Sequence, residues 1–322
     1  MTKRLSIIVA LLLSVASLFA AEREVLIDCS WGTISATLTT PESATETALL
    51  IVAGSGPTDR NGNSSLNLNT FCYKMLSDDL AAQGYAVLRY DKRGIGRSHL
   101  PAEATEETLT FDDYVADARC CVEYLRSEGY RHIVVVGHSE GGNIALHLST
   151  EPSTIDAAVL LCASGYPIDV ILLRQLSSQL MPAHIGLMLR AEVIIRSLKQ
   201  SVRVAEEDIP QELLALFRPS VQPFLISQMQ SDPQALAAES RCPMLIITGG
   251  HDIQVTPDNG EVLAEAAPEA RHVTIERMSH VLKSADSNDR MEQLLSVYTN
   301  SQLPLSEGLT AEIAAFLRHY NL

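Results

Sequence analysis

The chain has 322 residues, of which 46% are hydrophobic and 20% charged, and its formal net charge at pH 7 is −15. This length is enough for one large domain with an insertion. The strong acidity argues against nucleic acid or an anionic membrane surface as a partner, because both carry negative charge themselves. A neutral small molecule remains compatible with this composition.

The start of the chain has the pattern of a secretory signal peptide. Lys3 and Arg4 precede an almost uninterrupted apolar run over residues 5–19, and two alanines follow it. The run is short for a membrane span, which needs about 20 residues. We therefore predict a signal peptide over residues 1–21, export to a periplasm or beyond, and a mature domain over residues 22–322 without membrane association.

The first part of the mature chain predicts a β-hairpin. Residues 24–28 and 33–38 alternate apolar and polar side chains, and Trp31 and Gly32 lie between them. This alternation is typical of strands with one buried face. We expect an antiparallel hairpin at the edge of a sheet.

Buried-strand and helix patterns then alternate up to residue 162. The strands are short apolar runs rich in β-branched residues, and the helices repeat apolar residues every three or four positions. The expected elements are a strand at 49–53, a helix at 76–83, a strand at 85–90, a helix at 111–128, a strand at 134–136, a helix at 143–148 and a strand at 157–162. Such alternation predicts a parallel sheet with helices on both faces.

The alternation stops near residue 167 and resumes near residue 244. Between them only helical patterns occur, at 170–180, 185–200, 210–217, 221–229 and 234–238. A strand at 244–248, a helix at 260–266, a strand at 272–276 and a closing helix at 310–320 follow. The fold class is therefore α/β, with a mostly parallel central sheet in one domain and a helical insertion over about 167–240.

A sharp turn follows the strand at 134–136. Residues 137–141 read Gly-His-Ser-Glu-Gly, which fits the G-x-S-x-G pattern of a nucleophile elbow with Ser139 at its tip. At such an elbow the serine adopts strained backbone angles, and a Cβ on either flanking glycine would clash with neighbouring elements. A glycine-rich strand-to-helix turn without chemistry is the alternative if no partner residues exist.

Two later loops supply candidate partners for Ser139. A serine hydroxyl becomes a good nucleophile only when a base takes its proton and an acid orients that base. Asp252 follows the strand at 244–248, and His280 follows the last strand, so both lie at carboxyl ends of strands. We predict Ser139 as nucleophile, His280 as base and Asp252 as acid, with Asp169 as the competing acid.

Two backbone N–H groups should receive the oxyanion that forms when a carbonyl is attacked. One belongs to Glu140, the residue after the nucleophile. The other should come from the loop after the first buried strand. Pro57 has no N–H, which leaves Ser55 or Gly56, and we prefer Gly56.

The six cysteines follow no zinc-binding spacing. Cys162 lies at a predicted strand position, where a small buried hydrophobe is expected. Cys120 and Cys121 are adjacent on a predicted helix, so their side chains diverge. We predict no obligatory disulfide framework, no metal and no cofactor.

Three segments resemble the bacterial esterase-like branch of the α/β-hydrolase superfamily that is grouped with the S33-type serine aminopeptidases. They are Gly-Ser-Gly-Pro-Thr-Asp-Arg-Asn-Gly-Asn at 54–63, Phe-Arg-Pro-Ser-Val-Gln-Pro-Phe-Leu-Ile-Ser at 217–227 and Ser-His-Val-Leu-Lys at 279–283. The resemblance extends from about residue 49 to the C-terminus. The His-Gly pair that precedes the oxyanion loop in many such hydrolases is replaced here by Gly-Ser-Gly at 54–56.

This resemblance implies the α/β-hydrolase fold, a Ser139–Asp252–His280 triad and a helical cap over the site. With the motifs above, it predicts a serine hydrolase that cleaves small carboxylic esters through an acyl-serine intermediate. Two alternatives remain. An aminopeptidase acting on short peptides would need a cap carboxylate for the free amino group, whereas the acidic run at 206–208 fits a solvated helix start. A non-catalytic binding protein on the same fold is the other.

Overall fold

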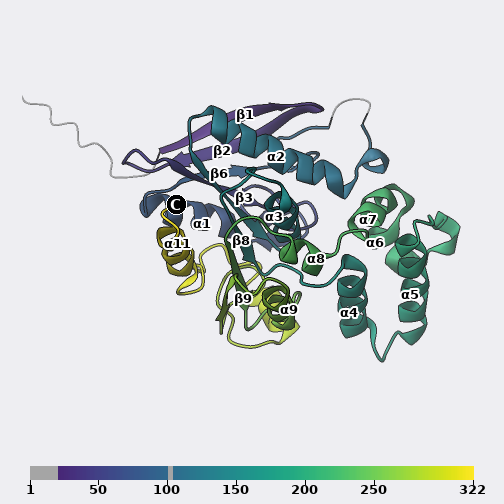
Figure 1. Ribbon diagram of the computed structural model, residues 1–322. Coiled ribbons are helices and arrows are strands. Elements are labelled where there is room, and N and C mark those ends of the chain that lie inside the picture. The colour runs from purple at the N-terminus through teal and green to yellow at the C-terminus, as the bar shows by residue number, and fades with distance from the viewer. Residues whose placement is uncertain (1–20, 101–103) are drawn as a thin grey trace, which may run out of the picture.

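The computed structural model describes residues 21–100 and 104–322 (Figure 1). The predicted signal peptide lies outside these ranges except for its last residue, so its cleavage stays a prediction. Within the ranges described, no helix combines the length and the apolar character needed to cross a membrane.

One eight-stranded sheet organises the chain, in the order β1-β2-β6-β3-β7-β8-β9-β10. Its strands are β1 (Ala21–Cys29), β2 (Gly32–Thr40), β3 (Thr47–Val52), β6 (Ala86–Tyr90), β7 (His132–His138), β8 (Ala157–Leu161), β9 (Met244–Gly249) and β10 (Arg271–Ile275). The pairs β1–β2 and β2–β6 are antiparallel and the five other pairs are parallel. The predicted mostly parallel sheet with an edge hairpin is confirmed.

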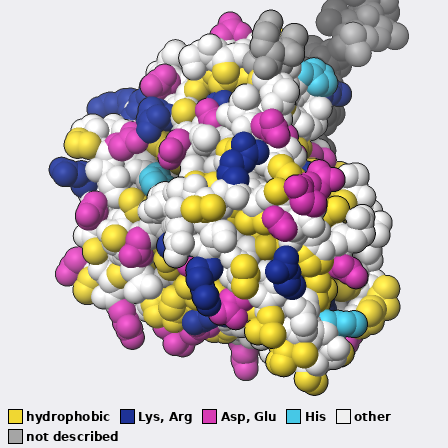
Figure 2. Space-filling model, turned by 90° about the vertical axis from the view of Figure 1, so that its right-hand side faces the viewer, with side chains coloured by type: hydrophobic (Ala, Val, Ile, Leu, Met, Phe, Trp, Pro, Cys, Tyr) yellow, Lys and Arg dark blue, Asp and Glu magenta, His cyan; other side chains and the backbone are white. Residues whose placement is uncertain are grey.

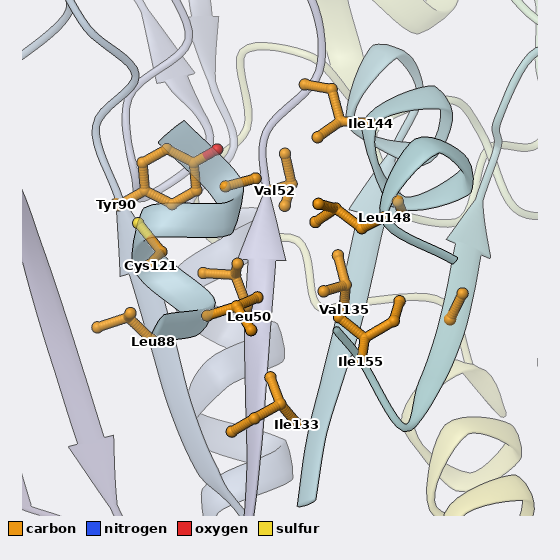
Figure 3. Packing of buried hydrophobic residues seen from close by; sticks show 14 of the residues in the cluster. Leu50, Val52, Leu88, Tyr90, Cys121, Ile133, Val135, Ile144, Leu148 and Ile155 are labelled. Carbon is orange, nitrogen blue, oxygen red and sulfur yellow. The ribbon is translucent and has the colours of Figure 1, made fainter. Parts of the chain in front are cut away.

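Helices cover both faces of this sheet. They are α1 (Cys72–Ala82), α2 (Phe111–Ser127), α3 (Glu140–Thr150), α9 (Asp258–Ala266) and α11 (Leu309–His319). Alternate residues of each central strand point to opposite faces. Leu50 and Val52 of β3 pack in one apolar cluster with α2, α3 and α9 (Figure 3). Leu49 and Ile51 pack in the other cluster with α1 and α11.

Only helical elements lie between β8 and β9. They are α4 (Ile168–Leu180), α5 (Ile185–Lys199), α6 (Leu214–Phe217), α7 (Gln222–Gln228) and α8 (Pro233–Ala238), with three short 3₁₀ turns before α7. Helices α4 to α7 form a group at one side of the sheet body (Figure 1), which we call the cap. The cap has its own small core, which includes Ile194, Leu198 and Phe217.

Among the strands and α-helices, three short elements were not anticipated from the sequence. They are β4 (Asn63–Ser64), β5 (Leu68–Asn69) and α10 (Arg290–Ser296). The two strands pair only with each other, and α10 spans two turns. Elements this short give too few residues for a periodic pattern to be recognised.

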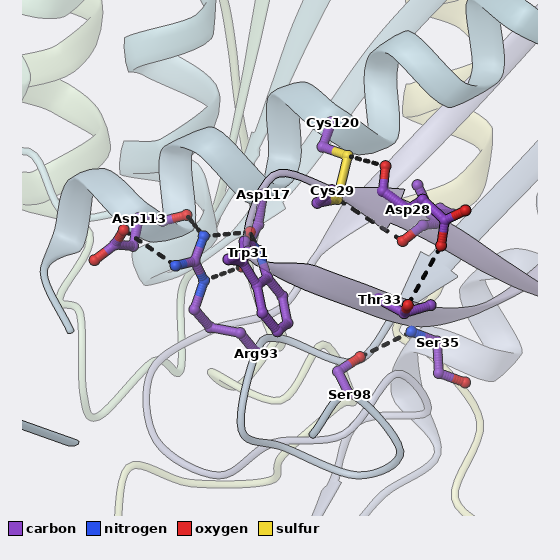
Figure 4. Close-up of a disulfide and its surroundings, with 11 residues drawn as sticks. Asp28, Cys29, Trp31, Thr33, Ser35, Arg93, Ser98, Asp113, Asp117 and Cys120 are labelled. Atoms are coloured by element: carbon purple, nitrogen blue, oxygen red, sulfur yellow. Dashed lines mark hydrogen bonds and ion pairs between the residues drawn. A yellow bond between two sulfur atoms is a disulfide. The ribbon is translucent and has the colours of Figure 1, made fainter. Parts of the chain in front are cut away.

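A disulfide joins Cys29 at the end of β1 to Cys120 on α2, with a Cα–Cα distance of 6.1 Å (Figure 4). The prediction of no disulfide framework is therefore wrong for this pair. Adjacent helix positions do diverge: Cys121 is fully buried in the core, and Cys120 points instead at the edge hairpin. Beside the disulfide, the Trp31 indole N–H donates to Asp117 Oδ1 at 2.6 Å, which gives the hairpin a second attachment to α2.

Candidate active site

The predicted elbow connects β7 to α3, and Ser139 stands at its tip with φ 53° and ψ −118°. Glycine is required on both sides of it. A Cβ on Gly137 would lie 2.1 Å from the Gly141 carbonyl oxygen, and one on Gly141 would lie 2.2 Å from the Val52 carbonyl oxygen. The close approach of β3, β7 and α3 thus sets the strained turn that presents a partly exposed Ser139 at the carboxyl edge of the sheet.

Asp252 and His280 meet at the same edge. His280 Nδ1 lies 2.7 Å from Asp252 Oδ2, and both side chains are buried. The other oxygen, Asp252 Oδ1, accepts the backbone N–H groups of Gln254 and Val255 at 2.8 and 2.9 Å. A carboxylate held in this way orients the imidazole so that Nδ1 carries a proton and Nε2 is free to accept one.

The residue before the serine connects the elbow to His280. His138 Nε2 lies 2.7 Å from the His280 carbonyl oxygen, and the two rings are 4.8 Å apart between centroids. The hydrogen bonds of the described residues do not include one between Ser139 Oγ and the His280 imidazole. Bonds of this kind are commonly long before substrate binds and tighten in the complex.

His138 also bonds to Tyr73 of α1, which in turn bonds to the loop after β3. Its Nε2 must donate, because the His280 carbonyl can only accept. Its Nδ1 therefore accepts from the Tyr73 hydroxyl at 2.7 Å, and that hydroxyl accepts from the Gly54 N–H at 3.0 Å. Burial lowers the pKa of His138 to about 3, with the nearby His280 as the next largest cause, so the ring stays neutral and the tautomer is fixed.

One predicted oxyanion donor directly follows Ser139 in the chain, and the other lies in the loop after β3. Glu140 is the first residue of α3, and the first N–H groups of a helix have no partner within it. Gly56 lies in the exposed loop after β3 and has φ 73°. This loop starts against the nucleophile, because a Cβ on Gly54 would lie 3.2 Å from Ser139 Cβ.

Sequence reasoning missed Tyr73 and two further residues at this site. The buried Lys92 ammonium donates to the Gly54 carbonyl oxygen at 2.6 Å and to Glu140 Oε1 at 3.3 Å. Gln228, the last residue of α7, donates to Glu140 Oε2 at 3.2 Å. Lys92 could have been found, because it lies two residues after the end of β6, which pairs in parallel with β3 and so ends at the same edge. Nothing in the sequence marks Gln228.

The competing acid Asp169 bonds elsewhere, and so do two other histidines of the chain. Asp169 lies on cap helix α4, where its Oδ1 is 3.1 Å from Lys199 Nζ. His251 bonds to the Ala285 carbonyl oxygen at 2.8 Å, and His272 bonds to Thr248 Oγ1 at 2.9 Å. Of the two predicted acids, only Asp252 reaches His280.

In the described part of the chain, His138, Cys162 and His280 bring possible metal-ligand atoms within 4.8 Å of one another. Both nitrogens of His138 and Nδ1 of His280 already hold the hydrogen bonds described above. Burial holds the pKa of the Cys162 thiol well above its usual value, which disfavours the thiolate that binds metals. We assign no metal to this group.

A cavity of about 450 Å³ lies beside the proposed oxyanion loop. Its walls come from Gly56 and its neighbours, from cap helix α4 through Gln175 and Gln179, and from Gln254 and Arg290. No aspartate or glutamate is among its described lining residues. The only charged group that lines it is Arg290, at the start of α10, and this guanidinium makes no ion pair with any residue in the ranges described.

The sheet order, the elbow and the Asp252–His280 pair define an α/β-hydrolase fold. Residues 67–284 match the model of a hydrolase family described as serine aminopeptidase, S33. The match spans more than half of the chain, and the chain belongs to this family.

Two curated relatives match parts of this chain in sequence. Esterase EstD of Thermotoga maritima is 26% identical over 243 residues, which is 74% of this chain and 55% of that protein. A non-heme chloroperoxidase of Streptomyces lividans is 37% identical over 84 residues, 26% of this chain and 28% of that protein. The chain thus spans about half the length of EstD and less of the second relative.

Solved structures share the fold over nearly the whole chain. An esterase of Pyrococcus furiosus has a TM-score of 0.60 at 16% identity, covering 95% of this chain and 92% of its own. Est1E of Butyrivibrio proteoclasticus with ferulic acid bound has a TM-score of 0.58 at 17% identity, covering 92% and 98%. A thermophilic esterase of Thermogutta terrifontis with malate bound has a TM-score of 0.56 at 20% identity, covering 93% and 100%.

Proposed function

We propose that the protein is a serine hydrolase that cleaves small carboxylic esters through an acyl intermediate on Ser139. The observation that carries this proposal is the His280–Asp252 bond of 2.7 Å. His138, the residue before Ser139, bonds to the His280 backbone and so joins this pair to the strained elbow. These groups lie at the carboxyl edge of the sheet, where catalytic loops of α/β folds gather.

The proposed reaction has two stages. Ser139 Oγ attacks the ester carbonyl carbon, and His280 Nε2 takes the hydroxyl proton, while the N–H groups of Glu140 and Gly56 receive the oxyanion. The intermediate collapses to the acyl-serine, and the protonated His280 gives its proton to the departing alcohol. Water, activated by the same imidazole, then releases the acid, and Asp252 orients His280 throughout. No cofactor takes part in this scheme.

Ester substrates are supported by the relatives and by the cavity. EstD and the Pyrococcus furiosus and Thermogutta terrifontis neighbours carry the name esterase. The cavity beside Gly56 presents a guanidinium and side-chain amides to its occupant. Such a lining suits neutral or anionic groups better than a cationic one.

Aminopeptidase activity is the second candidate, and the family description favours it. It would need a carboxylate to hold the free amino group of the peptide. Glu140, which follows the serine in the chain, is already paired with Lys92, and the cap acids of 206–208 are exposed. We therefore rank ester hydrolysis first. A binding protein without catalysis is the third candidate.

Export to a periplasm or to the medium remains part of the proposal. Its first support is the N-terminal sequence pattern. Its second support is the Cys29–Cys120 bond, because structural disulfides persist mainly in oxidising compartments.

The test is turnover of p-nitrophenyl acetate, butyrate and octanoate, with alanyl- and prolyl-p-nitroanilide in parallel. We expect ester turnover by the wild type and a loss of about 10,000-fold or more in Ser139→Ala. A fluorophosphonate probe should label the wild type and not the variant. Cleavage of the anilides alone would favour the peptidase, and a wild type without turnover or labelling would favour a binding protein.

A further inference from the structure

One buried ammonium contacts both segments that carry the proposed oxyanion donors. Lys92 Nζ lies 2.6 Å from the carbonyl oxygen of Gly54, two residues before Gly56, and 3.3 Å from the carboxylate of Glu140. The Lys92 side chain is 1% exposed and that of Glu140 is 7% exposed. Neither charge can therefore be satisfied by bulk water, and each depends on the other.

The loop after β3 is held at its first residue from two sides. The Lys92 ammonium donates to the Gly54 carbonyl oxygen, and the Tyr73 hydroxyl oxygen accepts from the Gly54 N–H at 3.0 Å. Both backbone groups of Gly54 are thus fixed directly against Ser139. The two residues that follow, Ser55 and Gly56, are exposed.

The second contact fixes the start of α3. Glu140 contributes its N–H to the oxyanion site through the backbone, but its side chain extends away to Lys92. One carboxylate oxygen meets Lys92 and the other accepts from Gln228 of the cap at 3.2 Å. Gln228 is 4% exposed, so this link between cap and elbow is itself buried.

We infer that Lys92 and Glu140 are positioning residues that hold the two oxyanion donors in register, and that Gln228 couples the cap to them. This inference rests on the proposed ester hydrolysis. The donors must sit about 2.7–3.1 Å from the developing oxyanion, so a small displacement of either segment removes stabilisation of the transition state more than of the bound ester. The expected signature is a fall in kcat at nearly constant KM.

The experiment compares Lys92→Met, Glu140→Gln, the double variant Lys92→Met/Glu140→Gln and Gln228→Ala with the wild type. For each, kcat and KM are measured on p-nitrophenyl butyrate, together with Ki for a trifluoromethyl ketone that forms an oxyanion on the serine. Loss of one oxyanion donor costs roughly 100- to 1,000-fold in kcat, and misplacement should cost less. We expect kcat to fall about 10- to 100-fold in Lys92→Met and about 3- to 10-fold in Gln228→Ala, with Ki rising in parallel.

The double variant separates positioning from stability. Lys92→Met leaves a buried carboxylate without its partner, and Glu140→Gln then removes that uncompensated charge. The melting temperature should therefore recover in the double variant. Its kcat should stay low, because methionine cannot donate to the Gly54 carbonyl.

Matched controls are Gln230→Ala, two residues beyond Gln228 and exposed, and Glu192→Gln, which breaks an exposed ion pair with Arg196 on the cap. Both should leave kcat unchanged. Recovery of kcat together with melting temperature in the double variant, or an unchanged Ki in Lys92→Met, would overturn the positioning role. Equal effects of Gln228→Ala and Gln230→Ala would overturn the cap coupling. In either case an active wild type leaves the proposed function standing, whereas an inactive wild type would overturn both.

Discussion

The sheet body and the cap differ in how completely their elements are buried and how closely they pack. In the body, the central strands β3, β6, β8 and β9 are buried along their whole length and β7 along all but its first residue. At the elbow, backbone atoms approach one another so closely that no Cβ fits. In the cap, one face of α5 leaves Ile185, Leu189 and Val193 more than half exposed. On the cap side of the molecule (Figure 2), apolar side chains lie among acidic and basic ones.

This difference separates two tasks. The body fixes reacting groups, because every element at the elbow is packed against another. The cap encloses a small core of its own and reaches the elbow through the bond between Gln228 and Glu140. We therefore expect changes in the body to affect folding and kcat, and changes around the cap-lined cavity to affect selectivity.

The largest contrast in stability should come from replacing one glycine by alanine in each region. Gly141→Ala places a Cβ 2.2 Å from the Val52 carbonyl oxygen, and backbone must move to admit it. We expect a loss of more than about 4 kcal/mol in the free energy of unfolding, and no detectable esterase activity. Urea denaturation and soluble yield measure the effect.

Gly186→Ala in the cap should raise the free energy of unfolding slightly and leave the activity intact. Gly186 lies in the first turn of α5, where a Cβ would meet no atom within 4 Å. Alanine is the better helix former by up to about 1 kcal/mol, so the variant should be slightly more stable and fully active. Similar losses of stability at both positions would contradict the comparison.

Much of the body could be predicted from the sequence because its signals are local. The strands are continuous apolar runs, the helices have clear periodicity, and parallel strands end at one edge, which places the loops of Asp252 and His280 beside the elbow. Local patterns also predicted the cap helices. They could not predict where the cap docks, because the bond between Gln228 and Glu140 joins residues 88 positions apart.

The disulfide and Lys92 were missed for related reasons. Pairing of Cys29 with Cys120 depends on how α2 lies across the edge hairpin, which the spacing of the cysteines does not encode. A lysine after a strand is usually solvated. Only tertiary packing encloses this one, through the Gly54 loop and the Tyr114 ring, whose centroid lies 5.1 Å from Lys92 Nζ.

Reduction of the disulfide should weaken the body and leave the site intact. The bond closes a loop of 91 residues, and loss of such a constraint costs about 2–4 kcal/mol. Cys29→Ser/Cys120→Ser should therefore unfold at lower urea concentration, with kcat near that of wild type. Cys242→Ser, which removes a partly exposed free thiol, is the control. An unchanged urea midpoint after removal of the disulfide would show that the hairpin is held by its other contacts, such as Trp31 with Asp117.

Acid should destabilise the body through His138. Its pKa is about 3 in the folded protein and near its ordinary 6.5 in the unfolded chain, so the unfolded state binds the extra proton first. This contribution to stability is constant above pH 6.5, falls as the pH drops below that value, and levels off below pH 3. Between pH 6.5 and 4.5 the loss should be about 2–3 kcal/mol.

Stability measured against pH checks this. His138→Gln should be less stable than wild type at pH 7, because it loses two buried hydrogen bonds, but its stability should fall less steeply toward pH 4.5. His319→Gln, on the exposed end of α11, should keep the wild-type slope. Equal slopes in wild type and His138→Gln would mean that other groups carry the acid sensitivity.

The smallest effect should appear where the body meets the cap-lined cavity. Arg290 lines this cavity and is exposed, so an ion pair with a substrate carboxylate should contribute no more than about 1 kcal/mol, or roughly 5-fold in affinity. Arg290→Gln should raise KM for mono-p-nitrophenyl glutarate about 3- to 5-fold and leave KM for p-nitrophenyl valerate unchanged. The effect should shrink at high salt.

Arg174→Gln is the matched control, because Arg174 is exposed on α4, pairs with Asp258 at 2.7 Å and does not line the cavity. If Arg290→Gln and Arg174→Gln change KM for the two esters to the same extent, the cavity does not bind the carboxylate-bearing end of the substrate.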